Sequence, residues 1–177
     1  SLIDEMLTYA KFERELEHSS DLPKNEIVSW LTNIVSAEQQ NSVSKEISLN
    51  SNPTTAMFIT GFEPVYLRWA VRNLIRNALK HAKSKVDVIF EPGETECTIH
   101  VDDDGMGVSE SLREKIFEPF FRADRSRNKN TGGYGLGLAI AQRITLWHKG
   151  EIRVTDSPLG GARFSIHLPL HPFQEAP

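Results

Sequence analysis

The order of helix and strand patterns constrains the fold of this chain more than any other feature. Each of two long helical patterns is followed at once by a pair of strand patterns. The helical patterns cover 64–83 and 135–148, and the strand pairs cover Lys85–Phe90 with Thr95–Asp102 and Glu151–Thr155 with Ala162–Leu168. Strand pairs that flank single helices predict an α+β fold, in which a mixed sheet has helices layered on one face.

Shorter patterns surround this framework. Residues 1–17 are rich in helix formers, and apolar side chains recur there every three to four positions. This apolar stripe has no partner within its own segment, so it indicates either a helix packed on the main domain or the end of a helical dimerisation element. We therefore divide the chain into 1–17 and 18–177. The remaining predictions are short helices over 23–40 and 109–116, and strands near 43–49 and 56–60.

Composition excludes several classes of protein. The 177 residues are enough for one domain that needs no metal or disulfide to stabilise its core. The single Cys97 excludes an internal disulfide framework and fits a reducing compartment, and no zinc-ligand spacing is present. No apolar run approaches the roughly 18 residues of a membrane span. With 20 basic and 24 acidic residues, the net charge is −4, which argues against a nucleic-acid partner. We expect a soluble, cytosol-type domain that contacts neither nucleic acid nor membrane.

The helical pattern over 64–83 carries the first candidate site. Its apolar residues cover one broad face, while Asn73, Asn77 and Lys80 fall on the opposite face with His81 at the margin. Such a face is ordinarily only solvated, but asparagine is a weak helix former and brings no charge. A carboxamide oxygen can ligate Mg²⁺ while the ion keeps waters and phosphate oxygens. Lys80 could meet phosphate as a point charge.

An acidic, glycine-bearing loop over 101–107 follows a predicted strand directly. A calcium loop is excluded, because the ligand positions of such a loop would fall on His100 and Ser111, and neither is a carboxylate. Two interpretations remain open. The loop is either a tight turn capped by aspartate, or a buried aspartate that accepts a hydrogen bond from a ligand amine while glycine lets the backbone approach.

Glycines open the helical pattern over 135–148. A helix start with free N–H groups suits an anion, although a flexible hinge would use the same residues. The spacing matches neither a Walker loop nor a dinucleotide fingerprint. Upstream, a basic run is either solvated surface or a mobile lid, and it contains Arg122, Arg125, Arg127 and Lys129. The aromatic cluster over 116–121 is interpreted first as packing.

In this order, the four segments resemble the catalytic ATP-binding domain of sensor histidine kinases, within the gyrase, Hsp90, histidine kinase and MutL ATPase superfamily. The resemblance covers about 23–170. The family's asparagine, first glycine, phenylalanine and second glycine boxes match Asn73–His81, Asp103–Gly107, Phe117–Phe121 and Gly133–Leu138. The opening LIDEMLTYAKFE is similar to the end of the second helix of the dimerisation and phosphotransfer hairpin. The implied fold is a two-layer α/β sandwich that holds nucleotide between helices under a flexible lid.

The resemblance implies ATP and Mg²⁺ as cofactors and assigns roles to individual residues. Asn77 would ligate Mg²⁺, and Asn73 would support the site where metal and phosphate meet. Lys80 would contact phosphates, His81 would lie near the nucleotide, and Arg122 is a candidate for steadying the charge of the γ-phosphoryl group.

The glycine boxes would complete the nucleotide site. Asp103 would accept a hydrogen bond from the adenine amine, and Gly105 and Gly107 would shape that pocket. The residues that would present backbone N–H groups to phosphates are Gly133, Gly135, Gly137 and Leu138.

One departure from the family concerns the phosphoacceptor. No histidine of the chain has the family's acceptor motif, so the resemblance implies a fragment that holds the donor site without its acceptor. The implied partners are ATP or ADP, a histidine-bearing dimerisation domain of the same homodimeric protein, and a response regulator. The implied location is the cytoplasmic part of a bacterial inner-membrane sensor.

Two other functions stay open from the sequence, namely an ATPase that drives a conformational clamp and a non-enzymatic nucleotide-binding module. Hydrolytic members of the superfamily place a glutamate base four residues before the metal-binding asparagine, where this chain has Asn73. A carboxamide cannot take a proton from water, which favours transfer to a supplied nucleophile.

Overall fold

The central element is a five-stranded mixed sheet with strand order β2-β4-β5-β7-β6. The computed structural model describes residues 2–14, 22–42, 44–51, 59–122 and 134–170. The five strands are β2 (Glu46–Ser51), β4 (Lys85–Pro92), β5 (Glu96–Asp103), β6 (Glu151–Asp156) and β7 (Ala162–Pro169). Only β2 and β4 run parallel, and the other neighbours are antiparallel. The predicted mixed sheet is therefore confirmed.

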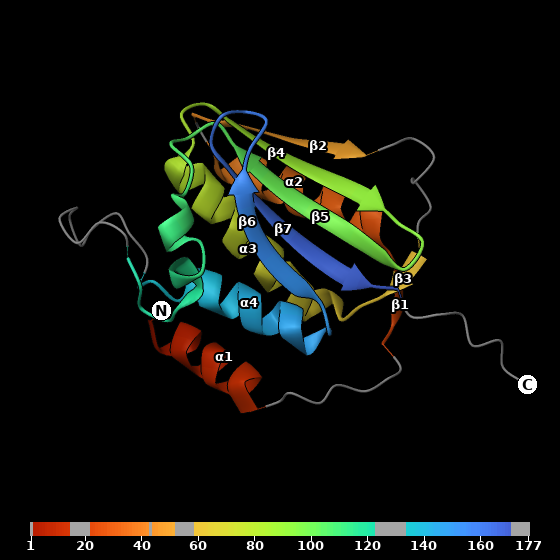
Figure 1. Ribbon diagram of the computed structural model, residues 1–177. Helices are drawn as coiled ribbons and strands as arrows, with labels where there is room; N and C mark the ends of the chain where they lie inside the picture. The colour runs from red at the N-terminus through yellow and green to blue at the C-terminus, as the bar shows by residue number, and fades with distance from the viewer. Residues whose placement is uncertain (1, 15–21, 43, 52–58, 123–133, 171–177) are drawn as a thin grey trace, which may run out of the picture.

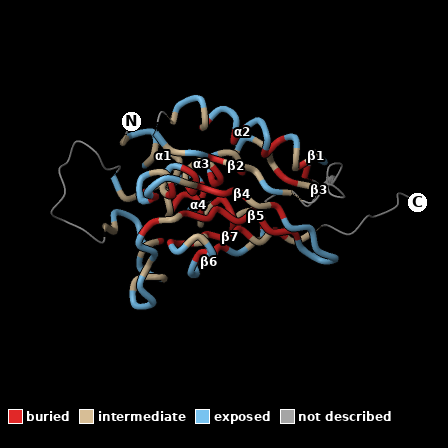
Figure 2. The backbone as a smooth tube through the Cα atoms, turned by 90° about the horizontal axis from the view of Figure 1, so that it is seen from above, coloured by how far each residue is buried: buried red, intermediate tan, exposed pale blue. Residues whose placement is uncertain are grey.

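The helices form a second layer on one face of this sheet (Figure 1). They are α1 (Leu2–Arg14), α2 (Ile27–Asn41), α3 (Pro64–His81) and α4 (Gly137–Trp147). No helix within the described ranges is both long enough and apolar enough to cross a bilayer. The core lies between the layers, where the buried backbone of the sheet meets the helices (Figure 2). From β5 it receives Cys97, Ile99 and Val101, which alternate along the strand as the sequence predicts.

Helix α1 packs on the main domain through Phe12. The Phe12 ring is almost fully buried and meets Tyr66 of α3 and Trp147 of α4 edge-on, at centroid distances of 4.8 and 6.2 Å. Ile3 and Leu7 of the same helix remain exposed. The predicted packing on the main domain is confirmed for α1, while its membership of a dimerisation element stays a prediction.

Two boundaries of the long helices differ from the sequence prediction, for local reasons. Helix α3 ends at His81 because Ala82 is already extended, with ψ of 149°. Helix α4 begins at Gly137 and not at Gly135, because Gly135 has φ of +78°, which a right-handed helix does not accommodate.

Two short segments also differ from prediction. Within the helix predicted over 23–40, three residues near its start form β1 (Lys24–Glu26) instead, and β1 pairs antiparallel with β3 (Ile59–Gly61) outside the main sheet. The helix predicted over 109–116 is instead two 3₁₀ turns, η2 (Glu110–Leu112) and η3 (Lys115–Phe117). Pro119 explains where η3 ends, since proline disfavours helical backbone in the residue before it and Glu118 is extended, with ψ of 137°. Val43 and residues 56–58 lie outside the described residues.

Candidate functional site

Asp103, at the end of β5, is a buried carboxylate with one oxygen satisfied by the backbone. Its side chain is 2% exposed, and Oδ1 accepts from the N–H of Gly105 at 2.8 Å and of Ala162 at 3.2 Å. Among the described residues, Oδ2 has no hydrogen-bond partner. Oδ2 is also not among the fully buried, unpartnered polar atoms of the described residues, so it is the oxygen that an external donor can reach.

Two glycines let the backbone close around Asp103. A Cβ at Gly161 would lie 2.1 Å from Oδ1 of Asp103, and a Cβ at Gly105 would lie 2.5 Å from the carbonyl oxygen of His81. Gly107 has φ of +75°, a conformation that favours glycine. Gly161 was not singled out from the sequence.

Asp104 has a different environment from its neighbour. Its carboxylate accepts from the N–H of Lys83 at 2.7 Å, the N–H of Ser84 at 3.1 Å and the hydroxyl of Ser84 at 2.7 Å. The hydrogen bond from the Ser84 hydroxyl, reinforced by those from the backbone, holds the pKa of the Asp104 carboxyl well below its usual range. Asp104 therefore fastens the turn that leads from α3 into β4.

The two asparagines of α3 are half-buried, and Lys80 and His81 are exposed. A Cβ at Gly137 would lie 3.1 Å from Oδ1 of Asn73, so this carboxamide packs against the start of α4. A purely solvated face is therefore the wrong description of this side of α3. The structure brings the predicted asparagine segment and the predicted glycine-rich helix start into contact.

The aromatic segment joins the same region. The N–H of Phe120 donates to the carbonyl of Gly135 at 2.9 Å, and a Cβ at Gly135 would lie 2.9 Å from the carbonyl carbon of Phe120. Phe117 is buried, with its ring edge-on to Phe164 at 6.3 Å. Phe120 is 57% exposed, so the packing predicted for this cluster holds for Phe117 and is wrong for Phe120.

The start of α4 has no side-chain cap. Leu136 occupies the N-cap position and its side chain accepts no hydrogen bond from the helix. Within the described residues, no side chain caps the first N–H groups of α4, from Gly137 and Leu138, and such an arrangement suits an anion. Arg122 is half-buried at the end of the aromatic segment. The predicted site residue Gly133 and the predicted lid over 123–133 lie outside the described residues.

Side chains that sequence reasoning missed hold α3 in place. Glu38 of α2 accepts from Arg72 and Arg76 of α3. Lys45 donates through Nζ to the carbonyls of Leu79 and Ala82 at the end of α3. The partners in these contacts are 34 to 38 residues apart in sequence, so no local pattern could have identified them.

Oxygen ligands for a metal are limited in this region. No group of three histidine, cysteine or acidic side chains among the described residues could hold a metal ion alone. The Asn77 carboxamide is a hard oxygen donor, and such a donor fits Mg²⁺ when phosphate oxygens and waters complete the coordination.

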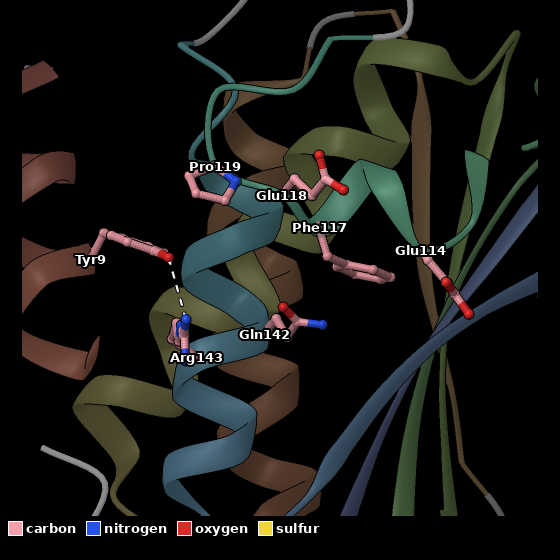
Figure 3. Close-up of a pocket in the computed structure, with 7 residues that line it drawn as sticks. All are labelled: Tyr9, Glu114, Phe117, Glu118, Pro119, Gln142 and Arg143. Atoms are coloured by element: carbon pink, nitrogen blue, oxygen red, sulfur yellow. Dashed lines mark hydrogen bonds between the residues drawn. The ribbon is translucent and has the colours of Figure 1, made fainter. Parts of the chain in front are cut away.

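A cavity of about 230 Å³ lies beside this region, between α1, α4 and the aromatic segment (Figure 3). Tyr9 of α1 and Arg143 of α4 face each other across it, with Nη2 of Arg143 donating to the Tyr9 hydroxyl at 3.5 Å. None of the predicted cofactor-binding residues lines this cavity. The cavity is therefore a separate hollow at the docked helix.

Comparisons with known proteins match the motifs described above. The sequence profile described as "Histidine kinase-, DNA gyrase B-, and HSP90-like ATPase" matches residues 63–172. The chain is 39% identical over 160 residues to the sensor histidine kinase CpxA of Escherichia coli (strain K12), covering 86% of this chain and 35% of CpxA. It is 35% identical over 170 residues to the sensor protein RstB of the same strain, covering 96% of this chain and 39% of RstB. The chain thus spans little more than a third of these relatives.

Solved structures that resemble this chain also come from histidine kinases or their ATP-binding domains. The ATP binding domain of PrrB from Mycobacterium tuberculosis is 30% identical, with a TM-score of 0.70 over 85% of this chain and 98% of that domain. Full-length ShkA in complex with AMPPNP is 24% identical, with a TM-score of 0.78 over 96% of this chain and 35% of ShkA. The likeness to ShkA bears on the fold alone.

Proposed function

The chain belongs to the histidine kinase-, DNA gyrase B- and HSP90-like ATPase family, and on that premise we propose that it is the catalytic domain of a sensor histidine kinase. It binds Mg²⁺-ATP and donates the γ-phosphoryl group to a histidine on another domain. The acceptor domain belongs to the same protein, which is a homodimer, and a response regulator receives the phosphoryl group next. The domain works on the cytoplasmic side of a bacterial inner membrane.

The observation that carries this proposal is the environment of Asp103. A buried carboxylate whose Oδ1 is held by two backbone N–H groups, and whose Oδ2 is left without a described partner, matches an exocyclic amine. Adenine bears such an amine at its edge, whereas guanine bears a carbonyl at the same ring position. The contact of Asn73 with the start of α4 supports a phosphate site close by.

The residues of the chain then divide the work of binding and orientation. Asp103 selects the base. Asn77 would hold Mg²⁺ with the support of Asn73, and bound Mg²⁺ would neutralise charge on the phosphates. Lys80, Arg122 and the first N–H groups of α4 contribute further positive charge toward the phosphates. Because Asn73 cannot take a proton from water, the chain orients ATP for a nucleophile that another domain supplies.

Nucleotide binding is tested by thermal denaturation with and without millimolar Mg²⁺-ADP. Ligand at about 100 times its dissociation constant is expected to stabilise the fold by roughly 2.7 kcal/mol. For a domain of this size, the melting temperature should then rise by at least about 2–4 °C. An unchanged melting temperature would remove the basis of the proposal.

Phosphoryl transfer is tested with γ-labelled ATP. The 177-residue chain alone is expected to leave ATP largely intact and to acquire no label, because positioning of the acceptor supplies most of the catalysis. Adding a dimerisation hairpin that carries the acceptor histidine should produce acid-labile, alkali-stable label on the hairpin. Rapid hydrolysis by the chain alone would instead favour the clamp ATPase.

A further inference from the structure

Glu38 is a buried carboxylate of α2 whose described partners are two arginines of α3. Its side chain is 4% exposed. Oε1 accepts from Nε of Arg72 at 2.6 Å, and Oε2 accepts from Nε of Arg76 at 3.3 Å. Each carboxylate oxygen therefore holds one turn of α3.

Stability alone does not account for a charge in this place. When an ion pair is buried, the loss of hydration offsets much of the attraction between its charges. Apolar residues of similar volume in the same place often give a protein equal or greater stability. Helix α2 already presents Ile34 and Val35 as buried side chains. The ion pair instead fixes the orientation of α3, because hydrogen bonds from two guanidinium groups to one carboxylate limit the rotation of α3 relative to α2.

The rotation of α3 matters because arginines and asparagines alternate on the same two turns. Asn73 follows Arg72 and Asn77 follows Arg76, so the two rows lie about 100° apart around the helix axis. A helix held by one row presents the other row in a fixed direction. Asn73 packs against the start of α4, where a Cβ at Gly137 would lie 3.1 Å from its Oδ1, so a rotation of α3 alters this contact.

We propose that Glu38 is a positioning residue that, through Arg72 and Arg76, aims Asn73 and Asn77 at the site where metal and phosphate meet. This inference rests on the Mg²⁺-nucleotide site of the proposed function. No other side chain in the described part of the chain bonds this arginine row. Lys45 holds only the C-terminal end of α3.

The test compares the affinity of the 177-residue chain for ADP with Mg²⁺ and with a chelator, by titration calorimetry. Glu38→Gln keeps the volume of the side chain and removes its charge. It is expected to weaken Mg²⁺-ADP binding about 10- to 100-fold, the usual effect of losing a group that orients a metal ligand. Binding of Mg²⁺-free ADP, which depends on Asp103, should change less than about twofold, because the two sites are separate.

Two further variants make the comparison decisive. Arg76→Gln removes only the contact to Oε2, from a side chain that is 59% exposed. Glu38 keeps its contact with Arg72, so no buried charge is left unpaired, and this variant tests the inference even where Glu38→Gln fails to fold. Glu151→Gln removes a matched carboxylate–guanidinium contact, with Arg153 on the edge strand β6. This control should leave both affinities unchanged.

A selective loss of Mg²⁺-ADP affinity in folded Glu38→Gln or Arg76→Gln supports the positioning role. Equal losses with and without Mg²⁺ would overturn it, because a merely structural contact does not distinguish the two ligands. The proposal would also be overturned if the ratio of ADP affinity with Mg²⁺ to ADP affinity without it were unchanged in every folded variant. If the unsubstituted chain itself gains no affinity from Mg²⁺, the proposed metal site fails, and this inference fails with it.

Discussion

Asp103 and Asp104 are adjacent in sequence, but their carboxylates have different partners. The Asp103 side chain is buried against backbone N–H groups of a loop and of β7. The Asp104 side chain closes the turn after α3. Successive side chains at the end of a strand point to opposite sides, so one carboxylate faces the proposed ligand and the other the scaffold.

Asp103→Asn is expected to abolish the preference for adenine. The amide oxygen can still accept from the N–H groups of Gly105 and Ala162, which places the amide NH₂ where Oδ2 was and opposes two donors. Losing a charge-assisted hydrogen bond costs about 1.5–3 kcal/mol, or roughly 10- to 150-fold in affinity. Titration with ADP and with inosine diphosphate measures the preference. Asp104→Asn is the control, and if it abolished ADP binding instead, the assignment of the two aspartates would be reversed.

Asp104 should also make the stability of the domain depend on pH. The folded state lowers the pKa of this carboxyl, so Asp104 contributes stability above its unfolded pKa of about 4 and loses that contribution as the pH falls through the folded pKa. Urea denaturation of the chain and of Asp104→Asn should therefore differ more at about pH 6 than at about pH 3. A difference that grows on acidification would contradict the assigned hydrogen bonds.

The helices and strands were largely predictable from sequence, because most of them are long enough for the apolar pattern of a helix or strand to repeat several times. Helix α3 and strands β4 to β7 lie within a few residues of the predicted ranges. The three-residue β1 was missed, since so short a segment is too brief to show a periodic pattern, whereas β3 overlaps the strand predicted near 56–60. The need for Gly161 was not visible either, because it arises from Asp103, which is distant in sequence. The individual roles assigned to Asn73, Asn77 and Lys80 stay predictions.

The turn between β6 and β7 should behave as part of the adenine site. Gly161→Ala would place a Cβ 2.1 Å from Oδ1 of Asp103, so the carboxylate has to move. ADP affinity is expected to fall at least about tenfold, as for loss of a charged hydrogen bond. Gly160→Ala is the matched control, because no atom lies within 4 Å of its Cβ and only its φ of +97° is strained. It should lower the melting temperature and leave ADP affinity unchanged.

At the scale of the molecule, α1 is joined to α3 and α4 by aromatic contacts. Phe12 fits between Tyr66 and Trp147, and Nζ of Lys11 lies 4.4 Å from the centroid of the Tyr66 ring. These contacts lie at the C-terminal end of α4, whereas the proposed phosphate site lies at its start. The two ends are about 15 Å apart along the helix.

Phe12→Ala should therefore weaken docking of α1 without weakening nucleotide binding. Truncation of a buried phenylalanine costs about 3–5 kcal/mol, an upper bound here because α1 can detach while the rest stays folded. Urea denaturation, monitored by tryptophan fluorescence, measures the loss of stability. Titration with ADP should give an unchanged affinity. Leu7→Ala, at a side chain of the same helix that is 66% exposed, should change neither. If Phe12→Ala lowered the affinity for ADP, docking of α1 at one end of α4 would be coupled to nucleotide binding at the other end, contrary to this prediction.

The place of β7 in the sheet sets the order in which the domain can be assembled. Although β7 follows every other strand along the chain, it occupies an interior slot and pairs with both β5 and β6. The Ala162 N–H that holds Asp103 belongs to this strand. During synthesis, when earlier segments fold first, the Asp103 carboxylate, which we propose reads adenine, therefore acquires its second backbone donor only when β7 inserts. Without β7, strand β6 lacks its partner in the sheet and the proposed nucleotide site lacks the Ala162 donor, so nucleotide binding is expected to begin only after the last strand is in place.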